Sequence, residues 1–393
     1  MAAASGDSLK ILHLLRAPVG GLFRHVLDLA RAQAERGHRV GLVADSTRGG
    51  ARAEQDVAEL APLMAFGVSR VPISRTIGPR DVSALLHVAR RVRDVSPDVI
   101  HGHGAKGAAY GRLVPRHGAI RAYTPHGGSL FFDWNTPEGV VYLSLERMLR
   151  PRTELFMFES AYIQDIFRRK VGEPGARARV VHNGIKASDF VPVVPEPGAT
   201  DLVFVGELRS PKGIEVLIEA IKRLTDSGHR ISATIVGDGR DGDALQAQVK
   251  AQGLGGAVRF VGAKPARAGF ALGRVVVIPS RAESLPYIVL EAIAAGMPMV
   301  VTDVGGIPEI FGPDAGSLIP AGDVDALVRA IRETLRDVGT PEAKLIPLRE
   351  RLQARLRTGF TVDAMTDAVI AAYRQAMAQR DGSNSAQAQA PGR

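Results

Sequence analysis

The sequence has no cysteine and few aromatic residues, and each shortage excludes a class of protein. With no cysteine among 393 residues, a disulfide scaffold, a thiolate zinc site and a cysteine nucleophile are all excluded. Aromatic residues make up 5% of the chain, too few for the stacking platforms that bind single-stranded nucleic acid. No apolar run approaches the ~20 residues of a membrane span, and residues 1–8 lack the apolar core of a signal peptide. We therefore expect a cytoplasmic protein.

The net charge of +9 is confined to the first half of the chain. Residues 1–190 contain 27 Lys and Arg against 18 Asp and Glu, a difference of +9, whereas residues 191–393 contain 23 of each and are neutral. Such a lopsided excess suggests an anionic partner for the first half, such as nucleic acid, a lipid surface or a phosphorylated substrate. Arginine supplies 41 of the 50 cations, so solvated surface arginine is the alternative explanation.

Short apolar runs alternate with amphipathic stretches, which is typical of βαβ units around a parallel sheet. The segment 191–200 interrupts this pattern, and its three prolines within seven residues mark a linker. At 393 residues the chain is too long for one ordinary core. We predict two Rossmann-like doubly wound α/β domains, with a first domain at 1–190, a linker at 191–200, a second domain at 201–345, helices at 346–380 that could cross back to the first domain, and a disordered tail at 381–393.

The individual elements follow from the same pattern. Helices are predicted at 22–35, 213–226, 243–251, 287–295 and 324–335. Strands are predicted at 9–15, 40–44, 98–101, 120–124, 154–158 and 179–182 in the first half, and at 201–205, 231–236, 258–261, 275–279 and 298–302 in the second.

Two motifs suggest ligands that their surroundings do not support. The glycines of GDGRDG at 237–242 fit a dinucleotide fingerprint, but Asp238 and Asp241 would place negative charge where a pyrophosphate sits. No acidic residue closes the next strand to hold a ribose, so an ordinary turn is the better interpretation. The HGH at 101–103 resembles a metal-binding pair, but later histidines and aspartates do not follow in the required order. We therefore expect no metal site.

Two other groups of residues point to an anionic, hydroxyl-bearing ligand. Lys212 opens a helix three residues after Arg209, and a helix N-terminus with two cations favours a diphosphate. Glu283 follows a predicted strand and Glu291 lies about one turn into the next helix, at the sheet edge where open α/β sheets bind ligands. The alternative explanation for the two cations is a solvated turn with incidental charges. The alternative for the two glutamates is that acids stabilise the N-terminus of a helix.

These residues lie within a longer resemblance. The segment PSRAESLPYIVLEAIAAGMPMVVTDVGGIPEI at 279–310 resembles the donor-site signature of glycosyltransferase family 4, whose members are retaining enzymes of the two-domain GT-B architecture. Other segments resemble that family in the same order, and the resemblance as a whole covers roughly residues 9–375. These segments are 18–40, 100–113, 123–128, 180–185 and 205–213. The resemblance implies two Rossmann-like domains that face a central cleft.

The resemblance also implies roles for single residues. Glu283 matches the glutamate that contacts the donor sugar near the reacting carbon, and Glu291 matches the one that holds the ribose. Lys212 matches a cation on the diphosphate. Many members have arginine directly after the loop glycine where this chain has Glu207, so we assign the second cation to Arg209.

Further residues complete the predicted site. The backbone amides around Ser284 and Leu285 would bind sugar and phosphate. Gly20 and Gly21 would let the first domain close on the donor, and His126 would contact the sugar. His103 and Lys106 are expected on the acceptor side. The catalytic set is Glu283, His126, Lys212 and Arg209.

The activity implied is glycosyl transfer, with retention, from a nucleotide diphosphate sugar to a hydroxyl acceptor. We expect a saccharide or lipid-linked saccharide acceptor in polysaccharide synthesis, no cofactor or required metal, and no nucleic-acid partner. Family members that extend lipid-linked saccharides dock a basic surface on anionic membranes, so we expect the basic half to attach peripherally to the inner face of the cytoplasmic membrane. A GT-B-fold nucleotide-sugar epimerase is the alternative function.

Overall fold

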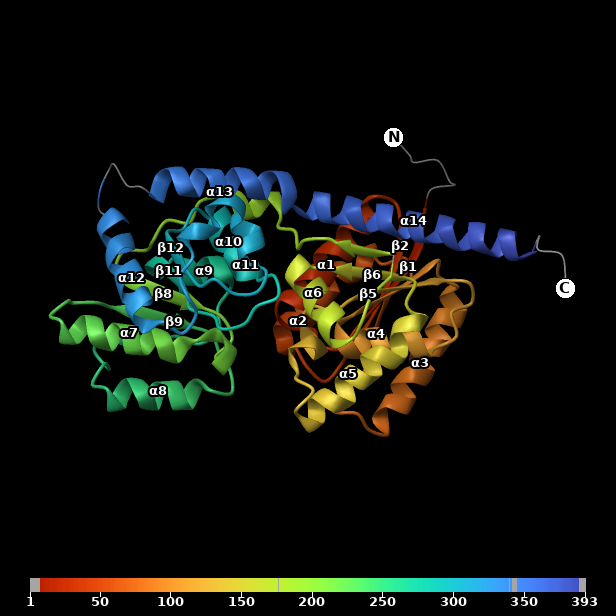
Figure 1. The fold of residues 1–393 in the computed structure, drawn as a ribbon, viewed down its shortest axis with the longest axis horizontal. Helices are drawn as coiled ribbons and strands as arrows, with labels where there is room; N and C mark the ends of the chain where they lie inside the picture. Colours follow the sequence, from red (N-terminus) through yellow and green to blue (C-terminus); the bar gives the residue numbers. More distant parts are fainter. Residues whose placement is uncertain (1–7, 176, 339, 341–344, 389–393) are drawn as a thin grey trace. The chain divides into compact units, whose positions relative to one another are not determined.

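The chain forms two compact units, which Figure 1 shows as a ribbon. The computed structural model describes residues 8–175, 177–338, 340 and 345–388. The first unit is made of residues 1–184 and 362–393, and the second of residues 185–361. No helix in the described part of the chain is both long and apolar enough to cross a membrane.

A seven-stranded parallel sheet forms the centre of the first unit, in the order β3-β2-β1-β4-β5-β6-β7. Neighbouring residues of a strand point to opposite faces, so Ile11 and Leu12 of β1 are buried in different hydrophobic clusters. The strands are β1 (Lys10–Leu15), β2 (Arg39–Asp45), β3 (Val68–Val71), β4 (Val99–His103), β5 (Ile120–Thr124), β6 (Leu155–Phe158) and β7 (Ala178–Val180).

Helices cover both faces of this sheet, as a parallel sheet requires. Leu12 packs with Val88 of α3 and Tyr110 of α4. Ile11 packs with Leu29 of α1 on the opposite face. The helices are α1 (Gly20–Glu35), α2 (Gly50–Leu60), α3 (Arg80–Val95), α4 (Gly104–Leu113), α5 (Pro137–Leu149) and α6 (Ala161–Lys170).

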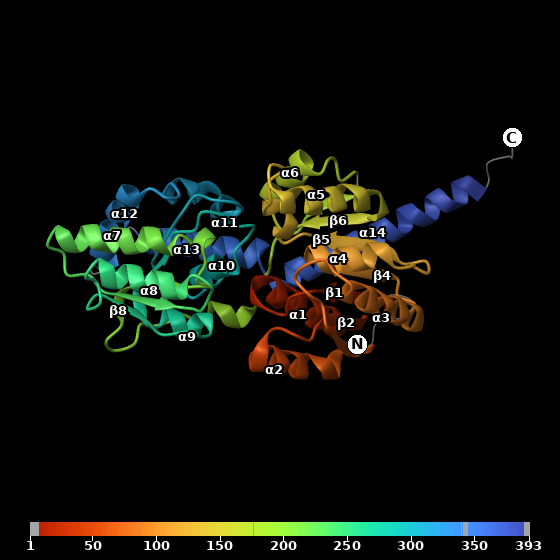
Figure 2. The ribbon, with the colours of Figure 1, turned by 90° about the horizontal axis from the view of Figure 1, so that it is seen from below.

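The last helix, α14 (Val362–Ala388), completes the first unit from the far end of the chain. It lies beside α1 and along β5 and β6 (Figures 1 and 2). Its buried residues recur every three or four positions and so form one apolar face on the sheet. They are Met365, Val369, Ala372, Tyr373 and Ala376.

The second unit has a five-stranded parallel sheet in the order β10-β9-β8-β11-β12. Leu202 and Val203 of β8 belong to clusters on opposite faces, one with α7 and α12 and the other with α10 and α13. The strands are β8 (Thr200–Val205), β9 (Ala233–Val236), β10 (Val258–Phe260), β11 (Gly273–Ile278) and β12 (Met299–Val301). The helices are α7 (Ile214–Asp226), α8 (Gly242–Ala251), α9 (Ala266–Phe270), α10 (Tyr287–Ala294), α11 (Ile307–Phe311), α12 (Val324–Val338) and α13 (Leu345–Gly359).

The borders of the units differ from the predicted ones. Phe190 and Val193, from the predicted first domain and linker, pack in the core of the second unit. Of the helices predicted at 346–380, α13 packs in the second unit and α14 on the first. Helix α14 runs to Ala388, through eight residues of the predicted disordered tail. Residues 389–393 of that tail lie outside the described residues.

Candidate functional site

Lys212 and Glu283, two of the residues predicted to bind the donor, lie on neighbouring loops of the second unit. Strands β8 and β11 are adjacent and parallel, so their carboxyl ends share one edge of the sheet. Lys212 ends the loop between β8 and α7, and Glu283 lies in the loop between β11 and α10. The Lys212 Nζ is 2.6 Å from Glu283 Oε1, and Ser280 Oγ donates to the same oxygen at 2.7 Å. The structure thus brings the predicted phosphate cation and the predicted sugar carboxylate together.

This ion pair is well buried but keeps hydrogen-bonding capacity for a ligand. The side chains of Lys212 and Glu283 are 16% and 9% exposed. Of the hydrogen bonds in the described part of the chain, none reaches Glu283 Oε2. The ammonium has three N–H donors, of which Glu283 takes one. A ligand with both hydroxyls and an anionic group suits this pair.

Two glycines permit the loops after β8 and β12 to approach the loop after β11 closely. Gly213 has φ +66°, and a Cβ there would lie 1.9 Å from the carbonyl oxygen of Pro279. Gly305 has φ +63°, and a Cβ there would lie 1.9 Å from the carbonyl oxygen of Glu283. No side chain fits at either position, because both the backbone conformation and the space exclude one.

The remaining predicted donor residues of the second unit differ in their exposure and in their partners. Arg209 pairs with Glu207 at 3.0 Å, and both side chains are exposed, at 43% and 63%, so this pair is weak and is not part of the buried pair. Glu291 lies on the second turn of α10 and is partly buried. Ser284 is partly buried, and Leu285 is buried in the hydrophobic core.

The glycines of GDGRDG have a packing explanation. A Cβ on Gly237 would lie 1.8 Å from the carbonyl oxygen of Gly206, and one on Gly239 would lie 2.3 Å from that of Leu208. Asp241 accepts a hydrogen bond from the backbone N–H of Ser210 at 2.6 Å. The motif therefore packs against the loop after β8 and holds it in place, which agrees with our interpretation of the motif as an ordinary turn.

In the first unit, His103 and His126 meet at the carboxyl ends of β4 and β5. His103 is the last residue of β4, and its Nδ1 is 3.2 Å from His126 Nε2. His126 has φ +54°, and its backbone N–H donates to Glu159 at 3.2 Å. Burial holds the pKa of both imidazoles well below the usual value, so both are neutral.

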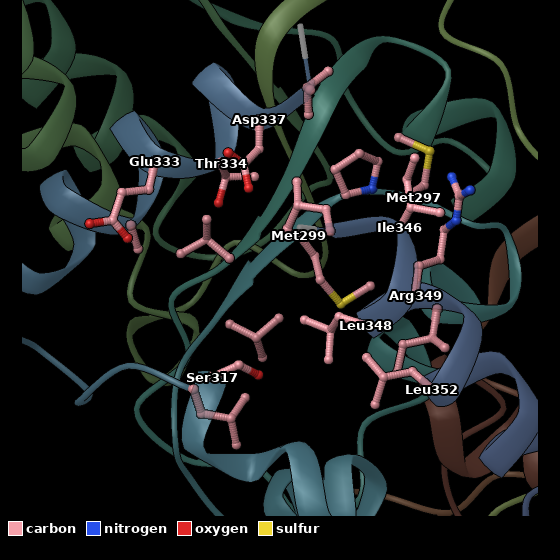
Figure 3. A pocket seen from close by; sticks show the side chains of 18 of the residues that line it. Met297, Met299, Ser317, Glu333, Thr334, Asp337, Ile346, Leu348, Arg349 and Leu352 are labelled. Atoms are coloured by element: carbon pink, nitrogen blue, oxygen red, sulfur yellow. The ribbon is translucent and has the colours of Figure 1, made fainter. Parts of the chain in front are cut away.

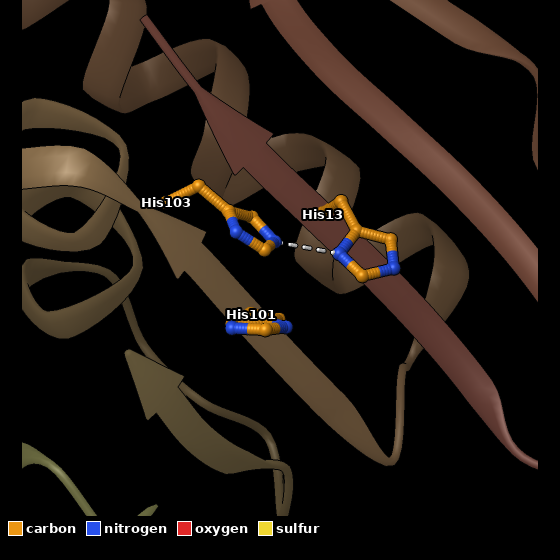
Figure 4. A group of neighbouring side chains, drawn as sticks. All are labelled: His13, His101 and His103. Atoms are coloured by element: carbon orange, nitrogen blue, oxygen red, sulfur yellow. Dashed lines mark hydrogen bonds between the residues drawn. The ribbon is translucent and has the colours of Figure 1, made fainter. Parts of the chain in front are cut away.

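Three further histidines extend this pair into a buried cluster. His13 of β1 donates its Nε2–H to the amide oxygen of Gln33 at 2.7 Å, and its Nδ1 is 3.0 Å from His103 Nε2 (Figure 4). His101 lies between the Tyr373 hydroxyl at 2.7 Å and the Thr124 hydroxyl at 2.9 Å. The ring nitrogens of His13, His101 and His103 lie within 4.8 Å of one another.

The third of these histidines, His25 of α1, forms a second group with His103 and His126, again within 4.8 Å. Its Nδ1 is 3.0 Å from Asn183 Oδ1. Burial lowers the pKa of His25, like that of His13, to about 4.

The other residues predicted on this side are placed differently. Lys106 of α4 is buried, and its ammonium donates to the Thr76 carbonyl at 2.8 Å and to Asp81 at 2.6 Å. It therefore anchors the segment before α3 and does not present a free cation to an acceptor. Gly20 and Gly21 are exposed at the start of α1, and no atom lies within 4 Å of a Cβ built on Gly20.

A separate pocket of about 390 Å³ lies in the second unit, between β12, α12 and α13 (Figure 3). Its lining is largely apolar and includes Met299 and Leu348, with Glu333 and Asp337 from α12. None of the predicted site residues lines it.

Sequence reasoning missed the partners of the first-unit histidines. His13 stands in the middle of an otherwise apolar strand, and a polar residue in such a run is the signal that was available. Gln33 and Asn183 gave no signal, because they reach the cluster only through contacts between residues 20 and 158 positions apart.

Comparisons with known proteins agree with the fold. Residues 19–189 match the model described as Glycosyltransferase Family 4, and residues 199–337 match that described as Glycosyl transferases group 1. A glycogen synthase of Mycobacterium tuberculosis is 28% identical over 387 residues, which cover 91% of this chain and 92% of that protein. A phosphatidyl-myo-inositol mannosyltransferase of Mycobacterium leprae is 28% identical over 335 residues, covering 81% of this chain and 84% of that protein.

The fold itself has solved counterparts. The solved structure of a sucrose-phosphate synthase from Thermosynechococcus elongatus superposes with a TM-score of 0.77 at 21% identity, covering 94% of this chain and 100% of that one. The two parallel-sheet units correspond to the two domains of the GT-B architecture. On this evidence the chain belongs to glycosyltransferase family 4 and has the GT-B fold.

Proposed function

We propose that this glycosyltransferase moves a sugar, with retention, from a nucleotide diphosphate sugar to a hydroxyl of a saccharide or lipid-linked saccharide. The observation that carries the proposal is the buried pair of Lys212 and Glu283 at the shared edge of β8 and β11. The mycobacterial relatives support the acceptor class, since one is a glycogen synthase and the other a phosphatidyl-myo-inositol mannosyltransferase. No observation favours the epimerase.

Lys212 acts on the leaving group in this scheme. Cleavage of the bond between the anomeric carbon and the phosphate oxygen develops negative charge on the departing nucleoside diphosphate. The Lys212 ammonium and the free N–H groups at the start of α7 stabilise that charge. Because Glu283 already holds the ammonium at 2.6 Å, the cation is in position before the donor arrives and loses little side-chain freedom on binding.

Glu283 positions the sugar and does not attack it. Its Oε1 accepts hydrogen bonds from both Lys212 and Ser280, and an oxygen engaged in this way is a poor nucleophile. Its Oε2 remains to accept a bond from a donor-sugar hydroxyl. The acceptor oxygen then bonds to the anomeric carbon from the face that the diphosphate leaves, and the acceptor proton passes to a phosphate oxygen. This stereochemistry gives retention without a covalent intermediate.

The test is release of nucleoside diphosphate from UDP-, GDP- and ADP-sugars by purified variants, each with an acceptor. Loss of one electrostatic contact to the leaving group costs about 100- to 1,000-fold in turnover, so we expect that loss for Lys212→Ala. We expect at least a 100-fold loss for Glu283→Gln, since the neutral amide binds both the ammonium and the sugar more weakly. Exposed Lys250 and Glu350 supply the matched controls Lys250→Ala and Glu350→Gln, which should keep full turnover.

Near-normal turnover of either site variant would refute the assigned roles. Retention is measured separately, by the anomeric configuration of the product, and an inverted product would overturn the stereochemical part of the proposal.

We further propose that the basic first unit attaches to an anionic membrane through α5 and the residues after it. Val140, Val141 and Met148 of α5 are exposed at 47%, 48% and 57% of their surface. The same region carries Arg147 and Arg152, and an exposed apolar stripe beside cations is typical of a helix that lies in a membrane interface.

The ion pairs limit which cations contribute to this attachment. Arg168, Arg169 and Lys170 each pair with a carboxylate, so their charges are already offset locally. Sedimentation with vesicles tests the proposal, and we expect binding to anionic vesicles that falls at high salt and is absent with neutral ones. Equal binding to both kinds of vesicle would refute it.

A further inference from the structure

Two buried imidazoles and one partly buried imidazole of the first unit bring ring nitrogens close together. His25 comes from α1, His103 ends β4, and His126 follows β5. One nitrogen of each lies within 4.8 Å of the others. His25 and His103 are 2% and 1% exposed, whereas His126 is only partly buried, so the cluster can be reached from the side of His126.

The hydrogen bonds fix which nitrogen of His25 carries the proton. The oxygen of an amide only accepts, so His25 donates its Nδ1–H to Asn183 Oδ1 at 3.0 Å. The Nε2 of this neutral ring therefore has a lone pair. That buried nitrogen has no hydrogen-bond partner among the described residues. An unpartnered buried acceptor is costly, and it is the feature here that calls for a ligand.

A second chain of hydrogen bonds fixes His103 in the same way. The Gln33 oxygen takes the Nε2–H of His13, so the bare Nδ1 of His13 accepts the Nε2–H of His103 at 3.0 Å. The Nδ1 of His103 is then also a lone pair, which accepts the Nε2–H of neutral His126 at 3.2 Å. An ion bound between these two nitrogens would replace that hydrogen bond, and His126 would then carry its proton on Nδ1. Metal-binding histidines have this arrangement, in which the second ring nitrogen donates to a polar partner that orients the ring.

The spacing fits a transition-metal ion. Tetrahedral bonds of about 2.0–2.1 Å from nitrogen to Zn²⁺ separate two ligand nitrogens by about 3.3 Å, close to the 3.2 Å between His103 and His126. The donor set is three nitrogens without thiolate or carboxylate, which suits Zn²⁺ and its neighbours and not Mg²⁺ or Ca²⁺. The buried side chain of Glu159 accepts the backbone N–H of His126 at 3.2 Å and so holds the backbone of the third ligand in place.

The other histidine group offers no such site. Both nitrogens of His101 are engaged, by the hydroxyls of Tyr373 and Thr124. Both nitrogens of His13 are engaged as well, by Gln33 and His103. Of the three histidines in Figure 4, His13 therefore orients His103, and neither His13 nor His101 has a lone pair left for an ion.

We propose that His25, His103 and His126 bind one Zn²⁺ ion through His25 Nε2, His103 Nδ1 and His126 Nε2. Asn183 and His13 orient the first two rings from behind. Three protein ligands leave a fourth position for water or another small ligand. This proposal departs from the sequence-based expectation of no metal site, and it assigns His126, a member of the predicted catalytic set, to the ion. It uses neither Lys212 nor Glu283, so it stands or falls separately from the proposed transfer reaction.

The test uses the full chain without a polyhistidine tag, stripped with a chelator and dialysed against Zn²⁺ in the absence of any sugar donor. We expect one zinc per chain by elemental analysis, no displacement by excess Mg²⁺, and a stronger, tetrahedral-type visible absorption when Co²⁺ replaces zinc. His25→Gln should weaken binding at least tenfold. Asn183→Ala keeps all three ligands but frees the His25 ring, and loss of such a partner weakens binding about 10- to 100-fold.

Two control variants separate this site from other histidines. His229→Gln removes an exposed histidine of the second unit and should bind zinc as the parent does. His101→Gln alters the neighbouring group and should also keep the ion. The proposal is overturned if the parent binds no zinc, if both His25→Gln and Asn183→Ala bind as tightly as the parent, or if only His101→Gln loses the ion. Should His25→Gln fail to fold, Asn183→Ala alone decides.

Discussion

Removing one charge from the buried ion pair of α4 and α5 should destabilise the first unit strongly. The side chains of Arg112 and Glu146 are 2% and 3% exposed and lie 3.0 Å apart. Glu146 also accepts hydrogen bonds from the hydroxyls of Tyr123 and Ser129, both at 2.8 Å. The substitution Glu146→Gln keeps the shape and leaves the Arg112 guanidinium as an uncompensated buried charge.

The size of the effect follows from that burial. Removing one partner of a buried pair costs about 3–5 kcal/mol in the free energy of unfolding. With a urea m-value of about 3 kcal/mol per molar, this cost lowers the unfolding midpoint by about 1–1.7 M. The control Glu138→Gln changes an exposed acid on the same helix and should shift the midpoint by less than about 0.2 M.

The assay is urea unfolding followed by tryptophan fluorescence. The chain has one tryptophan, Trp134, which lies in the first unit and donates to the Lys170 carbonyl at 3.1 Å. Its emission therefore reports on the unfolding of this unit and not of the second. This matters because a single free energy of unfolding is not well defined when two units unfold in separate transitions. A midpoint shift of Glu146→Gln no larger than that of the control would refute the reasoning, because the guanidinium would then tolerate burial without its partner.

Other substitutions test contacts elsewhere in the chain. Gly213→Ala should abolish transfer, because its Cβ would lie 1.9 Å from a carbonyl oxygen of the neighbouring loop; an active variant would show that the loops are not held as described. Tyr373→Phe removes the hydroxyl that lies 2.7 Å from His101 and should cost about 1–3 kcal/mol, measured by the same fluorescence assay. A double change of Val141 and Met148 to serine should reduce sedimentation with anionic vesicles while leaving transfer to a soluble acceptor intact, and unaltered sedimentation would exclude α5 as the docking helix.

The positions of Lys212 and Glu283 in the fold could be predicted because they depend on the pattern of residues close to each of them in the sequence. Lys212 and Glu283 each stand at the junction of an apolar strand and a helix, and such junctions are visible in the pattern of residues. Adjacent parallel strands then bring the two loops together without any further specification. What the pattern did not reveal is that the two side chains bind each other, since that depends on the order of strands in the sheet.

Three features of the molecule could not be predicted from the sequence, each for a different physical reason. Strand β3 (Val68–Val71) went unrecognised because it is a short edge strand with only Val71 buried. The histidine cluster depends on contacts across large separations, of which His101 with Tyr373 spans 272 positions. Residues 381–388 continue a helix although their composition favours disorder, since a helix already anchored by its apolar face extends at low cost.

The attachment of α14 to the first sheet affects the order in which the protein can fold during its synthesis. The face of the sheet that includes Ile11 and Val99 is covered by Tyr373 and its neighbours in α14. Residues 185–388, which include the whole second unit, follow Gly184 before that helix is complete. At about 5–20 residues per second this delay is about 10–40 s. For that time the nascent first unit exposes an apolar surface, so this protein needs protection on the ribosome that a continuous domain would not need.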